Sequence, residues 1–354
     1  MASVGGVIFL NHLIWDSMRP RPIPTPQVPI GLSSLSAREC GACHQDIYSE
    51  WLESRMGNSM QNAAFLMDWK AKGELPYCLS CHAPLEAQQP EILHGVVWPL
   101  PMVLSRDPNP LFDPDLRSEG VTCVVCHVRD GAVVTAKQVH APHPTHVGAL
   151  GEVCARCHQM PTSPLHPLRR PLIDTWGEHA NWKDKTGQSE DCVACHMPRT
   201  ERNGGAGHSH RFPGGWDPVV VNASVALSVP TYEGDHWVVE LTNLTGHRFP
   251  TGETTVSAEL RFVGLDEKGQ PLATETTPIG RHVMGPPFID IDDSSLLEGE
   301  TRAFRAQFSN DPQRRIRTVR VEVWKLRYFF EPELRKTIAP QDAEALVATA
   351  ESKP

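Results

Sequence analysis

Cysteine and histidine recur together at five places in this chain of 354 residues. At each place two cysteines are separated by two residues, and a histidine follows the second cysteine directly, which gives the pattern C-x-x-C-H. The five groups are Cys40, Cys43 and His44; Cys78, Cys81 and His82; Cys123, Cys126 and His127; Cys154, Cys157 and His158; and Cys192, Cys195 and His196. These motifs use all ten cysteines of the chain.

The C-x-x-C-H pattern is typical of covalent haem attachment. Two thiols at this spacing reach the two vinyl groups on one porphyrin edge, and the next residue on the same turn points its imidazole at the iron. A disulfide framework gives no reason for a histidine after every second cysteine. Zinc sites of this type need two pairs per metal, which five pairs cannot match evenly. The sequence therefore predicts five haem c groups with the five histidines as proximal iron ligands.

Composition and charge narrow the class of protein further. The apolar fraction of 40% excludes a disordered or collagen-like chain. A formal net charge of −9 without a long basic run speaks against a nucleic-acid partner. A mildly acidic surface suits docking to a basic redox protein. The 32 prolines predict many turns and short helices.

The compartment follows from the cofactor, because haem is attached to this motif outside the cytoplasm in bacteria and archaea. We therefore expect an exported protein of the periplasm or cell surface. The apolar stretch 4–15 is too short for a clear membrane span, and we interpret it as a signal-peptide remnant or short anchor, hence a candidate membrane contact. Residues 19–29 predict a semi-rigid, proline-rich linker, or alternatively an ordered arm lying on the fold. Together they make a predicted segment 1–36.

All five motifs fall in a predicted pentahaem domain, 37–215. Helical periodicity is fair over 37–67, where Tyr48, Trp51 and Leu52 are expected on one face. Elsewhere proline punctuates the segment, and the stretches between motifs share little pattern. The number of residues per haem is too small to build a separate hydrophobic core around each haem. Stacked porphyrins must therefore supply much of the core. We expect a mostly helical or irregular, haem-packed domain.

The pattern changes to strict alternation in a second predicted domain, 216–330. Alternating apolar residues predict short strands, 266–269 predicts a hairpin turn, and a change of phase predicts a bulge near Trp324. The expected strands cover 221–229, 237–241, 256–262 and 318–323. Together they predict an antiparallel β-sandwich. The tail 331–354 adds a predicted helix at 341–351, and the fold class is α+β.

Twelve further histidines exceed the number needed as distal ligands, which favours six-coordinate irons. The segment from Cys40 through Tyr48-Ser-Glu-Trp51-Leu-Glu-Ser54-Arg-Met56 resembles the opening of cytochrome c-554-like multihaem cytochromes. So do C-L-S-C-H-A-P from Cys78, E-G-V-T-C from Glu119 and C-V-A-C-H-M-P from Cys192. The resemblance covers about 37–215. It implies an electron carrier related to the haem cores of nitrite reductase and hydroxylamine oxidoreductase.

The resemblance also directs the choice of distal ligands. The family commonly has a histidine two residues after the serine of W-x-x-S, where this chain has Met56. A thioether ligand would raise the potential of one haem; Met60 is the rival, and apolar packing against a haem face is the alternative. The remaining distal candidates are His146, chosen over His140 and His143, His210, and then His179 and His94.

His247 is a distal candidate because of its loop. It lies in Gly246-His-Arg-Phe-Pro-Thr-Gly252, a phrase that resembles one in multihaem cytochromes with a β-domain. A histidine on such a loop is well placed to reach a haem across a domain interface. The alternative is that it only caps the loop.

Three functions fit these features. We favour an electron carrier, not an enzyme, whose partners are other cytochromes or a quinone-linked membrane complex of a respiratory chain. An oxidoreductase of nitrite or hydroxylamine type would have one open iron, and the C-x-x-C-K motif of pentahaem nitrite reductases does not occur in this sequence. A subunit of an extracellular cytochrome filament is the third alternative.

Overall fold

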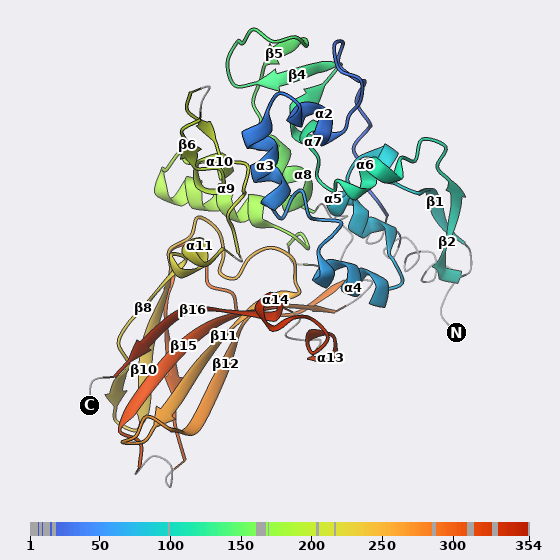
Figure 1. Cartoon of the computed structure of the whole chain (residues 1–354). Coiled ribbons are helices and arrows are strands. Elements are labelled where there is room, and N and C mark those ends of the chain that lie inside the picture. Colours follow the sequence, from blue (N-terminus) through green and yellow to red (C-terminus); the bar gives the residue numbers. More distant parts are fainter. Residues whose placement is uncertain are drawn as a thin grey trace. The chain divides into compact units, whose positions relative to one another are not determined.

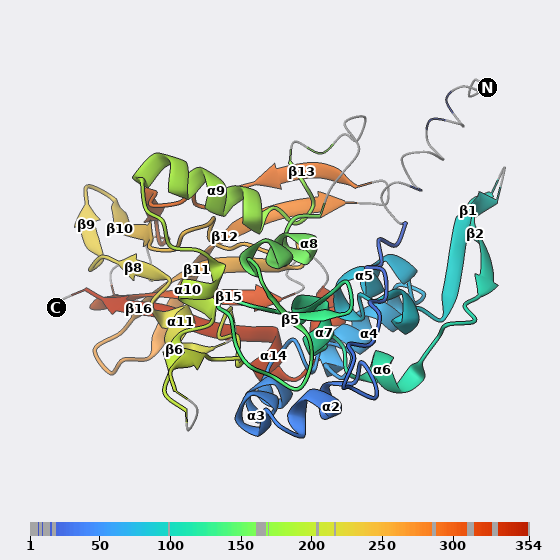
Figure 2. The ribbon, with the colours of Figure 1, turned by 90° about the horizontal axis from the view of Figure 1, so that it is seen from above.

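The computed structural model (Figures 1 and 2) describes residues 6, 9, 15, 19–97, 100–160, 168, 170–202, 205–215, 217–284, 288–309, 315–327 and 332–352. The chain forms two compact units. The first comprises Met1–His166, Glu190–Pro213 and Gly285–Phe288, and the second comprises Pro167–Ser189, Gly214–Met284 and Ile289–Pro354. The predicted domain boundary at 215 lies close to one of these divisions, whereas 167–189 groups with the second unit. The four predicted domains themselves stay a prediction.

Short helices carry most of the first unit. They are α2 (Ala37–Gly41), α3 (Gln45–Glu53), α4 (Ala63–Ala71), α5 (Leu79–His82), α6 (Pro114–Ser118), α7 (Cys123–His127), α8 (Ala155–His158) and α10 (Cys192–His196), with 3-10 turns η1 (Pro76–Cys78), η2 (Glu86–Gln88) and η3 (Gly151–Cys154). Side-chain caps define several of their starts, since Asn62 accepts from Phe65 N and Asp191 from Ala194 N. Tyr48 and Trp51 stack on the predicted face, with ring centroids 5.6 Å apart, and Trp51 is buried, whereas Leu52 is exposed.

Strands of the first unit are short, apart from one antiparallel ribbon of β1 (Glu91–Val97) and β2 (Leu100–Pro108). The sequence did not predict this ribbon, because prolines punctuate its second strand. A two-stranded ribbon leaves a free edge on each strand, where a missing N–H is tolerated. The other strands are β3 (Val128–Arg129), β4 (Ala132–Thr135), β5 (Thr145–Val147), β6 (Arg199–Thr200) and β7 (Gly207–His208).

The proline-rich segment near the N-terminus lies on the first unit. Ile23 pairs with Leu85, donating to Pro84 O at 2.6 Å and accepting from Glu86 N at 2.9 Å. Arg21 N also donates to Ser80 Oγ at 2.8 Å. This part of the chain is therefore the ordered arm, not a free linker. The predicted export remnant, 4–15, falls almost wholly outside the described residues.

No helix among the described residues has both the length and the apolar character needed to cross a bilayer.

The second unit is built on two antiparallel sheets (Figures 1 and 2). One has the order β14-β10-β8, with β9 also paired to β10, and the other has the order β13-β12-β11-β15-β16. The strands are β8 (Val225–Leu227), β9 (Thr231–Glu233), β10 (His236–Asn243), β11 (Val256–Leu265), β12 (Pro271–Met284), β13 (Ile289–Asp293), β14 (Thr301–Ala306), β15 (Thr318–Arg327) and β16 (Glu344–Glu351). Its helices are α9 (Thr175–Thr186), α11 (Pro218–Asn222), α13 (Pro332–Arg335) and α14 (Pro340–Ala343).

Both sheets share one hydrophobic core. Leu241 and Phe304 from the first sheet belong to the same buried cluster as Leu260, Phe262 and Val321 from the second. Alternate residues of each strand point into this core, as a period of two requires. Two antiparallel sheets packed over a common core form a β-sandwich, and the chain as a whole has the predicted α+β content.

Two local features of the sandwich, a hairpin turn and a bulge, were predicted from the sequence. The predicted hairpin joins β11 to β12, where Asp266 Oδ1 accepts from Lys268 N and Gln270 N, each at 2.8 Å, and Gly269 has a φ of +74°. The predicted bulge is confirmed as a register shift between Val323 and Trp324.

Two predicted elements of the second unit need correction. The expected strand at 221–229 is confirmed only over β8, because its first residues end helix α11, which Asp217 caps and whose first turn holds Pro218. The expected helix at 341–351 is instead mainly strand β16, which pairs with β15 and buries Val347. Its alanine-rich composition favours a helix, but the hydrogen bonds of an open sheet edge outweigh that preference.

Candidate haem-binding sites

Each C-x-x-C-H motif forms about one turn of helix. In the first motif His44 N donates to Cys40 O at 2.9 Å, and the other four motifs are formed by α5, α7, α8 and α10 with their preceding turns. One helical turn brings both thiols and the imidazole to one side of the backbone, as attachment to a single porphyrin requires. None of the ten cysteines forms a disulfide.

Thiols of different motifs contact one another in the first unit. The contacting pairs are Cys40 with Cys123, Cys81 with Cys157, and Cys154 with Cys192. Burial raises the pKa of the Cys126 thiol to about 11, and this thiol is also close enough to Cys157 for their charges to interact. The first motif therefore adjoins the third, the third adjoins the fourth, and the fourth adjoins the second and fifth.

Glu119 joins the first motif to the third. Its carboxylate accepts hydrogen bonds from Ser36 Oγ, from Ala37 N at 2.8 Å and from Thr122 Oγ1 at 3.0 Å. The first two are donors at the start of α2, so a residue next to the third motif caps the helix of the first. Trp51 Nε1 adds a hydrogen bond to Val121 O at 2.9 Å. Family-like residues outside the motifs thus hold two attachment turns together.

Three proximal histidines have Nδ1 hydrogen-bonded to main-chain carbonyls. His82 Nδ1 lies 3.1 Å from Ser59 O, His127 Nδ1 lies 3.2 Å from Val134 O, and His196 Nδ1 lies 2.7 Å from Pro213 O. A carbonyl can only accept, so Nδ1 carries the proton and Nε2 is the nitrogen left for iron. This is the usual arrangement of a metal-binding histidine.

His210 lies opposite the proximal histidine of the third motif. The ring centroids of His127 and His210 are 6.0 Å apart, with an angle of 31° between the ring planes. Metal–imidazole bonds are about 2 Å long, so two rings that share one metal have centroids roughly 6 Å apart. Burial, then the neighbouring His127, lowers the pKa of His210 to about 4, and burial also lowers that of His127. Both rings are therefore neutral, the form that binds iron.

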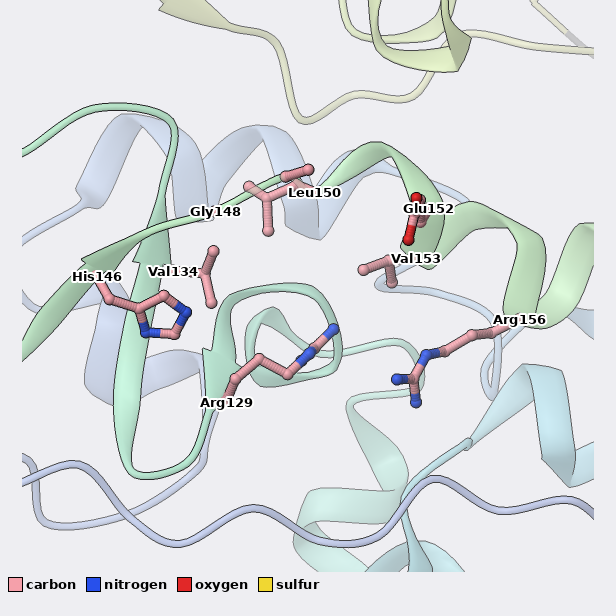
Figure 3. A pocket seen from close by; sticks show the side chains of 9 residues that line it. Arg129, Val134, His146, Gly148, Leu150, Glu152, Val153 and Arg156 are labelled. Atoms are coloured by element: carbon pink, nitrogen blue, oxygen red, sulfur yellow. The ribbon is translucent and has the colours of Figure 1, made fainter.

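His146 lies in a small polar pocket beside the third and fourth motifs (Figure 3). The pocket has a volume of about 250 Å³, and its lining also includes Arg129, Val134, Glu152 and Arg156. The two guanidinium groups point toward one another across it (Figure 3). His146 is exposed on β5. The structure places it near two motifs, and its role as a distal ligand stays a prediction.

His179 and His247 belong to the second unit, where they occupy neighbouring segments. His179 Nδ1 lies 3.0 Å from Gly246 O, and His247 Nδ1 lies 3.0 Å from Arg248 O. In both rings Nδ1 therefore carries the proton, as in the proximal histidines. His94, on the β1–β2 ribbon, instead has Nε2 2.9 Å from an Asp107 carboxylate oxygen. The ligand roles of His179 and His247 stay predictions.

The two methionine candidates differ in their surroundings. Met60 is buried with Phe65, Trp69 and Leu79 in a small apolar cluster, which matches the packing alternative. Met56 is half-buried in the turn after α3, and its carbonyl accepts from Val121 N at 3.2 Å. The turn is thereby fixed beside the third motif. Iron ligation by Met56 stays a prediction.

Other observations show that the first unit fits haem. Burial, and then the neighbouring His196, lower the pKa of His158, which favours the neutral ring that binds iron. The Nε of Arg202 is buried and has no hydrogen-bond partner among the described residues. A propionate is the kind of acceptor that a buried guanidinium requires. When bound, haem supplies an iron that cycles between two oxidation states.

Comparison with known proteins agrees with this geometry. The sequence model of the family described as cytochrome c554 and c-prime matches residues 39–96, which include the first two motifs. The crystal structure of a penta-heme cytochrome c552 from Thermochromatium tepidum aligns with a TM-score of 0.69, covering 92% of this chain and 99% of that chain. This chain resembles the cytochrome c554 family over residues 39–96, and it has the fold of a penta-heme cytochrome c. Its identity to the crystal structure is 18%, so that likeness shows the fold.

The resemblance to cytochrome c-554-like multihaem cytochromes, predicted from the sequence, is thus confirmed. The family match and the shared fold support haem c as the cofactor of this chain and electron transfer as its general activity. No curated protein matches its sequence. No role was predicted for Glu50 or Arg202, which contact the His210 segment; Glu50 lies in the family-like stretch from Tyr48 to Trp51, whereas Arg202 lies in no motif. A sequence signal near Arg202 is Gly207, where a Cβ would lie 2.6 Å from Arg202 Nη1.

Proposed function

We propose that this cytochrome is an extracytoplasmic electron carrier with five haems c, and that His127 and His210 ligate the iron of the third haem. The separation of these two rings, 6.0 Å between centroids, is the observation that carries the proposal. An iron with imidazoles on both faces has no open position for a substrate. A carrier requires this coordination, whereas an enzyme needs one open iron.

The contacts between motifs support transfer along the array. Each motif adjoins another through its cysteines, and no motif stands apart from the other four. Haems anchored to contacting turns have porphyrin edges near one another, so electrons cross short gaps. The contact pattern predicts a branch at the fourth haem, which adjoins the second, third and fifth.

The proposed donors and acceptors are other redox proteins, either cytochromes or a quinone-linked membrane complex. The net charge of −9 supports docking to basic surfaces. The periplasm or cell surface is the proposed location, since haem is attached there.

Electron paramagnetic resonance of the ferric cytochrome tests the ligation. We expect only low-spin signals in the wild type, and one new high-spin signal in His210→Ala. His208→Ala is the matched control, because His208 lies two residues away and its ring is bonded to Met197 O at 2.7 Å. A His210→Ala protein that stays fully low-spin would contradict the assignment. Strong high-spin signal with carbon monoxide binding in the reduced wild type would favour an enzyme.

A further inference from the structure

A half-buried ion pair holds the segment that carries His210. The carboxylate of Glu50, on α3, accepts from Arg202 Nη2 and from His210 N, the latter at 2.7 Å. The side chains of Arg202 and Glu50 are only 11% and 14% exposed. Charges this far from water are screened weakly, so they act strongly on their surroundings.

Arg202 also contacts the carbonyl oxygen that accepts a hydrogen bond from His210 Nδ1. His208 O accepts from Arg202 Nη2 at 2.9 Å and lies 3.0 Å from His210 Nδ1. A chain of contacts therefore runs from Glu50 through Arg202 and His208 O to His210. The partner of Nδ1 sets how strongly an iron-bound imidazole donates electrons. A guanidinium on the same carbonyl draws electron density away from that hydrogen bond.

The ion pair is fixed in place. Gly207 leaves room for the guanidinium, since a Cβ there would lie 2.6 Å from Arg202 Nη1. The Glu50 carboxylate accepts from both the Arg202 guanidinium and His210 N, so the pair consists of an anion and a cation at a defined position.

We propose that the Glu50–Arg202 pair sets the reduction potential of the haem ligated by His127 and His210, with its two charges acting in opposite directions. Ferric haem carries one more positive charge than ferrous haem. The Arg202 cation disfavours the ferric state and raises the potential, whereas the Glu50 anion favours it and lowers the potential. This inference rests on the proposed ligation by His210, and both residues are positioning residues.

Variants that neutralise one charge at a time test the proposal, because it predicts the sign of each shift in reduction potential. We expect Arg202→Gln to lower the potential of one haem and Glu50→Gln to raise it, in spectroelectrochemical titrations of the five-haem protein. The double variant should return that potential close to the wild-type value. All irons should stay low-spin, because Gln keeps a polar group at each position.

The chain offers a matched control pair. Arg211 and Glu53 lie in the same loop and helix and form an ion pair at 3.1 Å, but their side chains are 50% and 60% exposed. Water screens exposed charges, so Arg211→Gln and Glu53→Gln should shift the potentials much less.

The outcomes separate this inference from the ligation. Shifts of equal sign in both variants, or no shift while every iron stays low-spin, would overturn the proposal and leave ligation by His210 intact. A high-spin iron in both variants would show a purely structural role and would also overturn it. Failure of the ligation itself appears separately, as a His210→Ala protein that remains low-spin.

Discussion

Gly120 shows how much a single residue contributes to the haem-binding unit. It lies between Glu119, which caps α2, and the third motif, and its φ is +61°. A Cβ at this position would lie 2.2 Å from Ser59 Oγ and 3.1 Å from Met56 O. Only glycine combines this backbone conformation with such close approach. The family-like phrase E-G-V-T-C is therefore a packing requirement as well as an attachment motif.

Gly120→Ala should destabilise the cytochrome by about 2–4 kcal/mol, from left-handed strain plus overpacking. Denaturant unfolding measures the change. Gly73→Ala is the control, because its φ is +73° but no atom lies within 4 Å of its Cβ position. That variant should cost about 1 kcal/mol, from strain alone. Equal effects of the two variants would show that the close packing around Gly120 is unimportant.

Met56 is the residue-scale prediction that bears most on the chemistry. If its thioether ligates an iron, the ferric protein has a weak near-infrared charge-transfer band that disappears in Met56→Ala. Met60→Leu should leave the band unchanged, because Met60 is packed in an apolar cluster. Absence of the band from the wild-type spectrum would contradict the ligation.

At the scale of elements, a buried carboxylate ties α9 to the loop after β10. Glu178 is 2% exposed and accepts from Arg170 Nη1 at 2.6 Å, Thr251 Oγ1 at 2.5 Å and Arg248 N at 3.2 Å. Burial raises its pKa, although these partners oppose the shift. Because both segments carry distal-ligand candidates, this carboxylate fixes how His179 is placed in the second unit.

Glu178→Ala should destabilise the cytochrome by about 3 kcal/mol, because it removes the buried acceptor shared by Arg170, Thr251 and Arg248 N. Lys336→Met is the comparison, since the side chains of Lys336 and its ion-pair partner Glu333 are 69% and 85% exposed. Removing an exposed cation should cost under about 1 kcal/mol. Urea denaturation of both variants checks the difference, and similar midpoints would refute the special role of Glu178.

At the scale of the whole molecule, haem attachment unites segments that have little core of their own. The buried apolar clusters of the first unit are small, whereas one large cluster fills the sandwich of the second. Five porphyrins would supply much of the missing apolar contact. We therefore expect the folding stability of the first unit to depend on bound haem more than that of the second unit does.

Mass spectrometry of the denatured protein should show five covalently attached haems. The double variant Cys192→Ala, Cys195→Ala should carry four, because thioether bonds are the only covalent link to the fifth haem. Any other wild-type count would contradict the count read from the motifs. The fifth motif is a suitable one to remove, since its second cysteine is exposed.

Sequence alone predicted much of the fold where local patterns and tertiary packing agree. Alternation located β10, β11 and β15, and the turn at 266–269 and the bulge near Trp324 followed from the same pattern. It failed where packing overrides propensity, since the alanine-rich 344–351 completes a sheet as β16. It also failed for the β1–β2 ribbon, whose prolines hid a strand.

The spacing of cysteine and histidine determined the cofactor and its proximal ligands, because thioether attachment and axial ligation need only one turn of chain. Only the tertiary structure decided which motifs adjoin one another and which histidine faces another. His210 was one candidate among several in the sequence, and its place opposite His127 depends on α3, Glu50 and Arg202, far apart along the chain. Distal ligands are long-range contacts, and long-range contacts are set by folding.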